Sequence, residues 1–304
     1  MKALNLNGKC LYTPNGAARE YAAVGCNFYR GCPYQCRYCY NRRGLTAKVM
    51  GLDHAVLDNC FTQESNRPKK YRNLTSEEFA FEMFKRELVK NVDYFRNTGI
   101  FFSFSTDPLC PDAFNLTWRC VDYATKEFEI PVKILTKNAD FSAQQMLLFD
   151  LIPLRRRKLI AFGFTLTGCD DWEPYASRNI DRIRMMRILH DMAFKIFASI
   201  EPVIDFDSSL RMVKKTVMSC NQYLIGLMSS RQANGLEPYD QEESLKFIGN
   251  VTSLLYGQGS AAVYWKESIR KLMTDSPVVM GLINDSPVSV SRDWSLFTRK
   301  DIEL

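Results

Sequence analysis

The chain has 304 residues, of which 46% are hydrophobic and 24% charged, so it is long enough for one large domain or two ordinary ones with a substantial core. It contains no run of 18 apolar residues, and its first residues lack the apolar segment and cleavage site of a secretory signal, so we expect a cytoplasmic protein without a membrane span. The formal charge of +6 is compatible with an anionic partner, and the two histidines argue against a His-ligated zinc site or a Ser-His-Asp triad.

The predicted elements alternate between strands and helices along most of the chain. A first strand is expected near residues 24–31, and residues 44–73 have no clear period, which is typical of an insertion or lid. From residue 74 onward, helices are expected at 74–92, 115–128, 142–152, 179–194 and 208–219, and strands at 99–108, 131–138, 159–168, 194–204 and 221–230. Nearly unbroken apolar strands separated by helices favour parallel β/α units that are buried on both faces.

Six strands of this kind are fewer than the eight of a full barrel. The pattern therefore predicts an α/β fold, either a partial (β/α)6 TIM-like barrel or an open α/β sheet. We expect an N-terminal extension at 1–23, the core at 24–228 and a C-terminal extension at 229–304 that packs on the core.

A cysteine cluster stands out in the stretch RGCPYQCRYCY, where Cys32, Cys36 and Cys39 are spaced as C-x3-C-x2-C. Thiolates this close in sequence can converge on one inorganic centre. Structural zinc takes four ligands, whereas an iron-sulfur cluster with three protein ligands leaves one iron open to bind a small molecule and pass it an electron. Tyr38 is placed to stack on a flat ligand beside that iron.

Zinc remains the alternative at this cluster, because Cys10, Cys26 or Cys60 can supply a fourth thiolate. Three unrelated buried cysteines are a further alternative. The seven other cysteines form no second compact CxxC-type group, so we expect a single cluster.

The sequence Cys32-x3-Cys36-x-Tyr38-Cys39 resembles the CxxxCxΦC signature of the radical S-adenosylmethionine enzymes. The resemblance implies a [4Fe-4S] cluster on the three cysteines and S-adenosylmethionine on the fourth iron. It further implies reductive cleavage to a 5′-deoxyadenosyl radical, which abstracts hydrogen from substrate, and a reductant such as flavodoxin or ferredoxin. The cofactors carry the hard chemistry, while the protein orients them.

Further motifs resemble the spore photoproduct lyase-like, or DNA repair photolyase-like, branch of that superfamily. They cover roughly residues 24–230 and follow in the family's order. The motifs are NFYRGCPYQCRYCYNR, STDP at 105–108, ILTKN at 134–138, FGFTLTG at 162–168 and EPYASRNIDR at 173–182. Several motifs in one order are more specific than the cysteine loop alone.

The motif match implies roles for residues at strand ends. Lys137 is expected to pair with the carboxylate of S-adenosylmethionine, and Asp107 to accept hydrogen bonds from its ribose hydroxyls, with Ser105 and Thr106 as neighbouring polar contacts. A solvated strand-end lysine and a simple Asp-Pro turn at residues 107–108 are the alternatives.

Four further residues lie on the predicted strands or in the segment that follows the fourth strand. Thr165 is expected to assist at the carboxylate, although a β-branched residue also suits a strand. Glu201 ends its strand at the same mouth, and we expect it to contact the cofactor. Glu173 and Arg182 are expected to pair with each other, or to cap and orient the helix that follows.

One residue departs from the pattern of the branch. Spore photoproduct lyase carries a hydrogen-donating cysteine in a CTSD-like motif, and Phe104 stands at that position here. Phenylalanine has no hydrogen of suitable bond strength, which argues against repair by that route. Cys110 and Cys169 follow the second and fourth strands and are the candidate donors, although a small buried thiol is the commoner case.

Nucleic acid is the candidate substrate partner, as a lesion or a modified base that is flipped out of the duplex. A positive stretch suited to phosphate contacts comprises residues 154–158, Arg178, Arg182, Arg184 and Arg187, and a solvated helix face with Asp partners is the alternative interpretation of it. The alternatives are a peptide or small metabolite as the substrate and, in a different class, a non-catalytic zinc-stabilised binding module.

Overall fold

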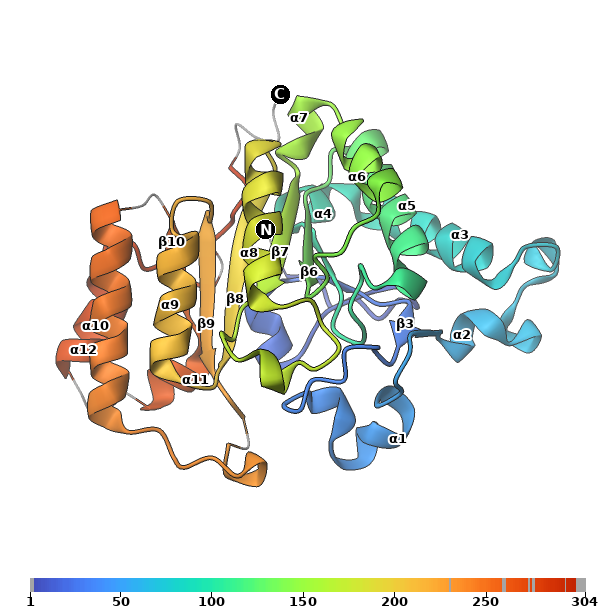
Figure 1. Cartoon of the computed structure of the whole chain (residues 1–304). Coiled ribbons are helices and arrows are strands. Elements are labelled where there is room, and N and C mark those ends of the chain that lie inside the picture. Colours follow the sequence, from blue (N-terminus) through green and yellow to red (C-terminus); the bar gives the residue numbers. More distant parts are fainter. Residues whose placement is uncertain are drawn as a thin grey trace.

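The fold is built on a mixed, mostly parallel sheet, seen in a computed structural model that describes residues 3–229, 231–258, 261–272, 274, 277–292 and 294–298. Eight strands follow the order β1-β2-β5-β6-β7-β8-β9-β10 (Figure 1). Strand β1 pairs antiparallel with β2, and each later pair is parallel. The strands are β1 (Leu11–Tyr12), β2 (Gly25–Cys26), β5 (Ile100–Phe102), β6 (Val132–Thr136), β7 (Ile160–Thr165), β8 (Lys195–Val203), β9 (Gln222–Leu227) and β10 (Ala262–Trp265).

The predicted strands of the core are all present, and one parallel strand was missed. Strand β10 pairs with β9 and lies within the region predicted as a C-terminal extension of mixed character. The short strands β3 (Tyr29–Arg30) and β4 (Val56–Leu57) form a separate antiparallel pair beside the cysteine loop, residues 31–39. The predicted partial barrel is consistent with this order, and no pairing joins β1 to β10 in the described part of the chain.

Five helices follow the predicted positions with shifted ends: α3 (Ser76–Leu88), α5 (Pro111–Phe128), α6 (Ala143–Asp150), α8 (Asn179–Asp191) and α9 (Phe206–Thr216). Five more, among the described residues after the insertion, were not predicted: α4 (Val92–Thr98), α7 (Leu154–Arg157), α10 (Gln241–Gln258), α11 (Glu267–Leu272) and α12 (Pro277–Asp285). Helix α3 begins at a capping box, in which the Thr75 hydroxyl accepts from the Glu78 N–H and the Glu78 side chain accepts from the Thr75 N–H. None of the helices in the described residues has the length and apolar character that a membrane crossing needs.

The two faces of the sheet bury different sets of side chains. Ile134, Phe162 and Ile200 belong to the large cluster beneath the helices. The opposite, inner face holds a smaller cluster in which Phe101 and Phe197 pack with Leu296 and Phe297 from the end of the described chain. Because residues in register across parallel strands share a face, Lys133 lies on the inner face between Phe101 and Ala161.

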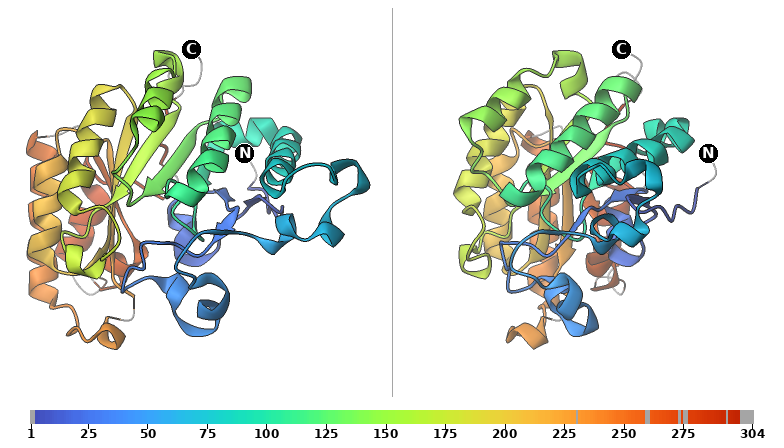
Figure 2. Two further views of the ribbon diagram at one scale, coloured as in Figure 1. Left: turned by 45° about the vertical axis from the view of Figure 1, so that its right-hand side comes forward. Right: turned by 90° about the vertical axis from the view of Figure 1, so that its right-hand side faces the viewer.

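The predicted insertion at 44–73 contains only short elements, α1 (Ala47–Met50), β4 and α2 (Asn59–Thr62) with intervening turns. Figures 1 and 2 show α1 away from the row of long helices, at the end of the sheet where the parallel strands finish. Helix α2 lies next to α3, where Phe61 contacts Phe79. The first part of the insertion therefore lies at the end of the sheet at which parallel β/α proteins place their sites.

Candidate cofactor site at the cysteine loop

The backbone of the cysteine loop is fixed at its start by Gly31. Gly31 has a φ of 79°, and a Cβ there would lie 2.6 Å from the Cβ of Leu52, so a side chain is excluded on both counts. The Cys32 N–H donates to Leu52 O at 3.1 Å, and the Cys39 N–H donates to Cys36 O at 3.0 Å. These bonds hold three thiols, none of which forms a disulfide, on one short loop.

The thiols of this loop are withdrawn from water beside a cation. Burial raises the pKa of Cys36 and of Cys32, while the charge of Lys137 acts to lower both pKa values. Such a donor set fits a metal centre that displaces the thiol protons. Among the residues that the structure describes, no three His, Cys, Asp or Glu side chains are arranged to hold a metal ion, so the ligand assignment stays a prediction.

A buried ion pair fastens the cysteine loop to the sheet. The Arg182 Nη2 lies 2.5 Å from Glu173 Oε2, and both side chains are fully buried, so the predicted pairing of these two residues is confirmed. The Tyr38 hydroxyl donates to Glu173 Oε1. The Arg37 N–H donates to Trp172 O at 2.9 Å. The middle of the cysteine loop is therefore bound through both side chain and backbone to the segment between β7 and α8.

The Arg182 guanidinium connects this segment to the end of strand β7. It donates from Nη1 to Thr165 O at 2.6 Å and from Nε to Ser177 O at 2.7 Å. The Thr167 hydroxyl adds a bond to Glu173 Oε2 at 3.3 Å. A buried charge pair is sustained only when its remaining donors and acceptors are satisfied, as they are here.

The Asp107 carboxylate joins the ends of strands β5 and β6. It is buried, and it accepts from Thr136 Oγ1 at 2.6 Å, from the Lys137 N–H at 2.6 Å and from the Leu109 N–H at 3.0 Å. Burial raises the pKa of Asp107, and these donors oppose the shift. Three of about four acceptor positions are occupied, so Asp107 positions the backbone of Lys137, and its predicted ribose contact stays a prediction.

Ser105 and Thr106 are buried and bond within the protein. The Ser105 hydroxyl donates to Tyr29 O at 2.5 Å, which connects the end of β5 to the strand before the cysteine loop. The Thr106 carbonyl accepts from Ser103 Oγ at 2.7 Å. The Thr106 hydroxyl is buried and has no hydrogen-bond partner among the described residues. Both residues support the loop in this structure, and their predicted cofactor contacts are untested.

Lys137 lies beside the cysteine loop, as the motif match implied. Its Nζ is 5.6 Å from the centroid of the Tyr38 ring. Burial acts to lower the pKa of Lys137, but the negative charges of Cys36 and Glu173 outweigh it and raise the pKa above its ordinary value. Lys137 therefore places a stable positive charge between the cysteine loop and the strand ends.

Glu201 lies on the inner face and is already paired. Its Oε2 accepts from Lys266 Nζ at 2.6 Å and from the Tyr21 hydroxyl at 2.5 Å. Glu20 lies 3.4 Å from the same ammonium and accepts from the Tyr264 hydroxyl at 3.1 Å. This network connects the N-terminal segment to β8 and β10, and the sequence analysis missed Lys266 and Glu20 because neither belongs to a recognisable motif.

The two candidate hydrogen donors occupy different environments. Cys110 is fully buried in the cluster beneath the helices, and burial raises its pKa to about 12. Cys169 is half-buried near Ser208 and Arg211. Phe104 stacks on Phe101 with centroids 4.5 Å apart. The placement of Cys110 does not favour contact with a substrate.

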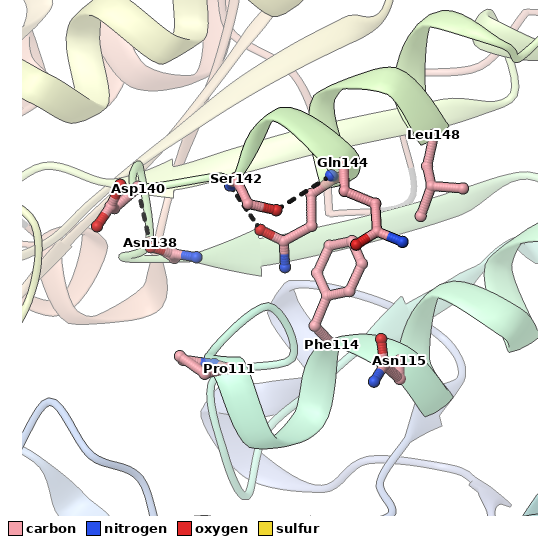
Figure 3. Close-up of a pocket in the computed structure, with 9 residues that line it drawn as sticks. Pro111, Phe114, Asn115, Asn138, Asp140, Ser142, Gln144 and Leu148 are labelled. Atoms are coloured by element: carbon pink, nitrogen blue, oxygen red, sulfur yellow. Dashed lines mark hydrogen bonds between the residues drawn. The ribbon is translucent and has the colours of Figure 1, made fainter.

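A surface cavity of about 530 Å³ lies between the beginnings of α5 and α6 (Figure 3). Its polar groups are largely engaged, since Asn138 Oδ1 accepts from the Asp140 N–H, and Ser142 and Gln145 form a capping box. It contains none of the predicted cofactor residues. The residues that line it are Pro111, Phe114, Asn115, Asn138, Asp140, Ser142, Gln144, Gln145 and Leu148.

The predicted positive stretch does not border the cysteine loop at residues 154–158, and Asp partners are present as in the alternative interpretation, since Arg178 and Arg184 both pair with Asp181. The part at 154–158 contains α7, before the start of strand β7, whereas the cysteine loop lies near the other end of that strand (Figure 1). Arg157 is buried and donates to Ile152 O at 2.7 Å, and Arg156 pairs with Asp122. Both guanidinium groups therefore have partners within the protein, and Arg156 Nε has no partner among the described residues.

Comparison of the fold identifies similar solved structures. No protein-family model and no curated protein matches the sequence. Streptococcus suis SuiB bound to S-adenosylmethionine matches with a TM-score of 0.54 and 12% identity over 85% of this chain and 54% of that chain. A double mutant of spore photoproduct lyase with bound S-adenosylmethionine and dinucleoside spore photoproduct matches with a TM-score of 0.56 and 12% identity over 83% and 78%.

Both of these structures hold S-adenosylmethionine, and this chain shares their mixed α/β fold. A single mutant of the lyase matches equally well, with a TM-score of 0.56 and 13% identity over 84% of this chain and 80% of that one. The chain spans about half the length of SuiB. This similarity concerns the fold, and the activity and substrate depend on the residues of the site.

Proposed function

We propose that the chain is a radical S-adenosylmethionine enzyme. The observation that carries the proposal is the placement of Lys137 beside a loop of three thiols, at the end of the sheet where β/α proteins build their sites. Cys32, Cys36 and Cys39 would hold a [4Fe-4S] cluster, which with S-adenosylmethionine supplies a one-electron reduction and a carbon radical that abstracts hydrogen from substrate.

The protein's own residues position these groups. Lys137 would pair with the carboxylate of S-adenosylmethionine through a charge-assisted hydrogen bond. Asp107 fixes the Lys137 backbone, and the pair of Glu173 with Arg182 fixes the loop through Tyr38. A low-potential reductant such as flavodoxin or ferredoxin would deliver the electron.

The substrate we propose is a nucleic-acid lesion or modified base. Two features support it, the motif order shared with the lyase-like branch and the fold shared with a lyase structure that holds a dinucleoside spore photoproduct. Phe104 replaces the hydrogen-donating cysteine of that branch, so the final hydrogen transfer would differ from that of the lyase.

The test is anaerobic reconstitution with iron and sulfide, followed by addition of S-adenosylmethionine and dithionite and an assay for 5′-deoxyadenosine. Cys36→Ala should lose the cluster and all product, whereas Cys120→Ala, a fully buried thiol beneath the helices, should retain both. Full iron content in Cys36→Ala would contradict the ligand assignment. Stoichiometric zinc in a colourless wild-type protein would establish the binding-module alternative instead.

A further inference from the structure

The net charge of the chain is concentrated around the cysteine loop. Residues 27–73 contain nine Lys and Arg against three Asp and Glu, a net charge of +6. The other 257 residues contain 31 residues of each sign and are neutral. The positive potential of the protein is therefore centred on the segment that carries the candidate site, where it would attract an anionic partner.

Apolar side chains on this segment are exposed to water among the cations. Leu45 is 97% exposed, Tyr40 59% and Val49 49%. Arg42 and Lys48 are exposed between them. These exposed apolar side chains add little burial energy to the folded chain. An exposed apolar group surrounded by charged residues is typical of an interaction site. We call residues 37–49 the entrance surface.

The entrance surface is attached to the body of the protein at fixed points. The Tyr40 hydroxyl donates to Phe104 O, which holds an exposed ring directly after Cys39. Arg43 donates from Nη1 to Ser229 O at 3.5 Å and also bonds to Asn234. The exposed ring of Tyr40 is therefore held next to the candidate cofactor site and is not part of a freely moving loop.

We propose that the entrance surface binds nucleic acid and guides a single-stranded or flipped-out nucleotide to the cysteine loop. Tyr40 and Leu45 would contact the faces of bases, and Arg42 and Lys48 would contact phosphates. The combination of an exposed aromatic ring with interleaved cations favours nucleic acid over an acidic protein, because it matches both base faces and backbone. The proposal rests on the proposed function, since it supplies the substrate of that site.

The first experiment measures binding of a fluorescein-labelled 12-residue thymidine oligonucleotide to reconstituted protein by fluorescence anisotropy, at 50 to 200 mM KCl. The double variant Arg42→Glu/Lys48→Glu should bind at least about tenfold more weakly, and the slope of log affinity against log salt should fall by about 1.4, for two lost phosphate contacts. The matched control Arg155→Glu/Lys158→Glu changes charge equally at the other end of the sheet and should bind as wild type.

The second experiment tests the stacking contact. Tyr40→Leu should weaken binding between about fivefold and a hundredfold, with iron content unchanged. Tyr256→Leu, which removes a 72% exposed ring on α10, should have no effect.

Three outcomes would overturn the proposal. They are no binding of DNA by wild type, equal loss in the Arg42/Lys48 and Arg155/Lys158 variants, and binding of polyglutamate as tight as that of DNA with no dependence on Tyr40. The last outcome would assign the surface to an acidic protein. Formation of 5′-deoxyadenosine without DNA tests the proposed function separately, so failure of one is distinguishable from failure of the other.

Discussion

The two ends of the parallel sheet satisfy their buried charges in different ways. Where the strands finish, Glu173 pairs with Arg182 from a later helix, and Asp107 accepts donors from the neighbouring strand. Where the strands begin, Arg157 donates to backbone carbonyls of nearby turns, and Lys133 has neither an ion pair nor a hydrogen bond in the described residues. Buried charges at the site end therefore have charged or hydrogen-bonding partners that position the site, whereas the Lys133 ammonium at the other end is buried without such a partner.

The largest expected effect comes from breaking the ion pair at the site end. Glu173→Gln leaves the Arg182 charge buried without its partner, so the free energy of unfolding should fall by about 3–5 kcal/mol. The matched control at the other end is Asp122→Asn, whose partner is Arg156. Because the Asp122 side chain is 46% exposed, that change should cost no more than about 1 kcal/mol. Urea unfolding measures both.

A second readout separates positioning from bulk stability. Tyr38 donates to Glu173, so Glu173→Gln should also lower the iron bound per chain after reconstitution, under conditions where the variant is fully folded. Equal stability losses in Glu173→Gln and Asp122→Asn, or an unchanged iron content, would contradict the contrast between the two ends.

The second-largest expected effect on stability concerns Lys133, near the end of the sheet where the parallel strands begin. Burial lowers its pKa to about 8 in the folded chain, below the ordinary value of 10.5. Below pH 8 the lysine is protonated in both states, and the folded state bears the cost of the buried charge. Between about pH 8 and 10 the unfolded chain binds more protons than the folded chain, so stability should rise with pH across that window.

Lys133→Met should remove both the cost of the buried charge and the rise in stability with pH. We expect it to raise the free energy of unfolding by about 2–3 kcal/mol at pH 7 and to abolish the rise between pH 8 and 10. Urea titrations at pH 7, 8, 9 and 10 measure this, with Lys158→Met as an exposed control from the same end of the sheet. A loss of stability at pH 7 would show that the ammonium has a stabilising partner.

Separation along the chain explains what the sequence could predict. Helices α3, α5, α6, α8 and α9, the core strands and the capping box at Thr75 follow from local periodicity and spacing. The pairing of Glu173 with Arg182 was also predictable, since nine residues separate them around the start of one helix. Features that lie close together along the chain leave a readable pattern.

Contacts between distant segments left no such pattern. Glu20 meets Lys266 across 246 residues, and the missed strand β10 lies outside the predicted core, where it pairs with β9. Asp107 has the motif position of a ligand contact, but its donors come from the end of β6, about thirty residues later. The position of the candidate site could be predicted from the sequence. The hydrogen bonds that support it could be found only in the structure.

The smallest effect separates two lysines near opposite ends of strand β6. Lys137→Ala should weaken binding of S-adenosylmethionine about 10- to 100-fold, because one charge-assisted hydrogen bond to a carboxylate is worth about 1.5–3 kcal/mol. Iron content should not change, since Lys137 is not a predicted ligand. Equilibrium dialysis on reconstituted protein measures the affinity. Lys133→Ala, four residues earlier, removes a cation remote from the cysteine loop and should leave the affinity intact. An equal loss in both variants would mean that general positive charge, and not the position of Lys137, binds the cofactor.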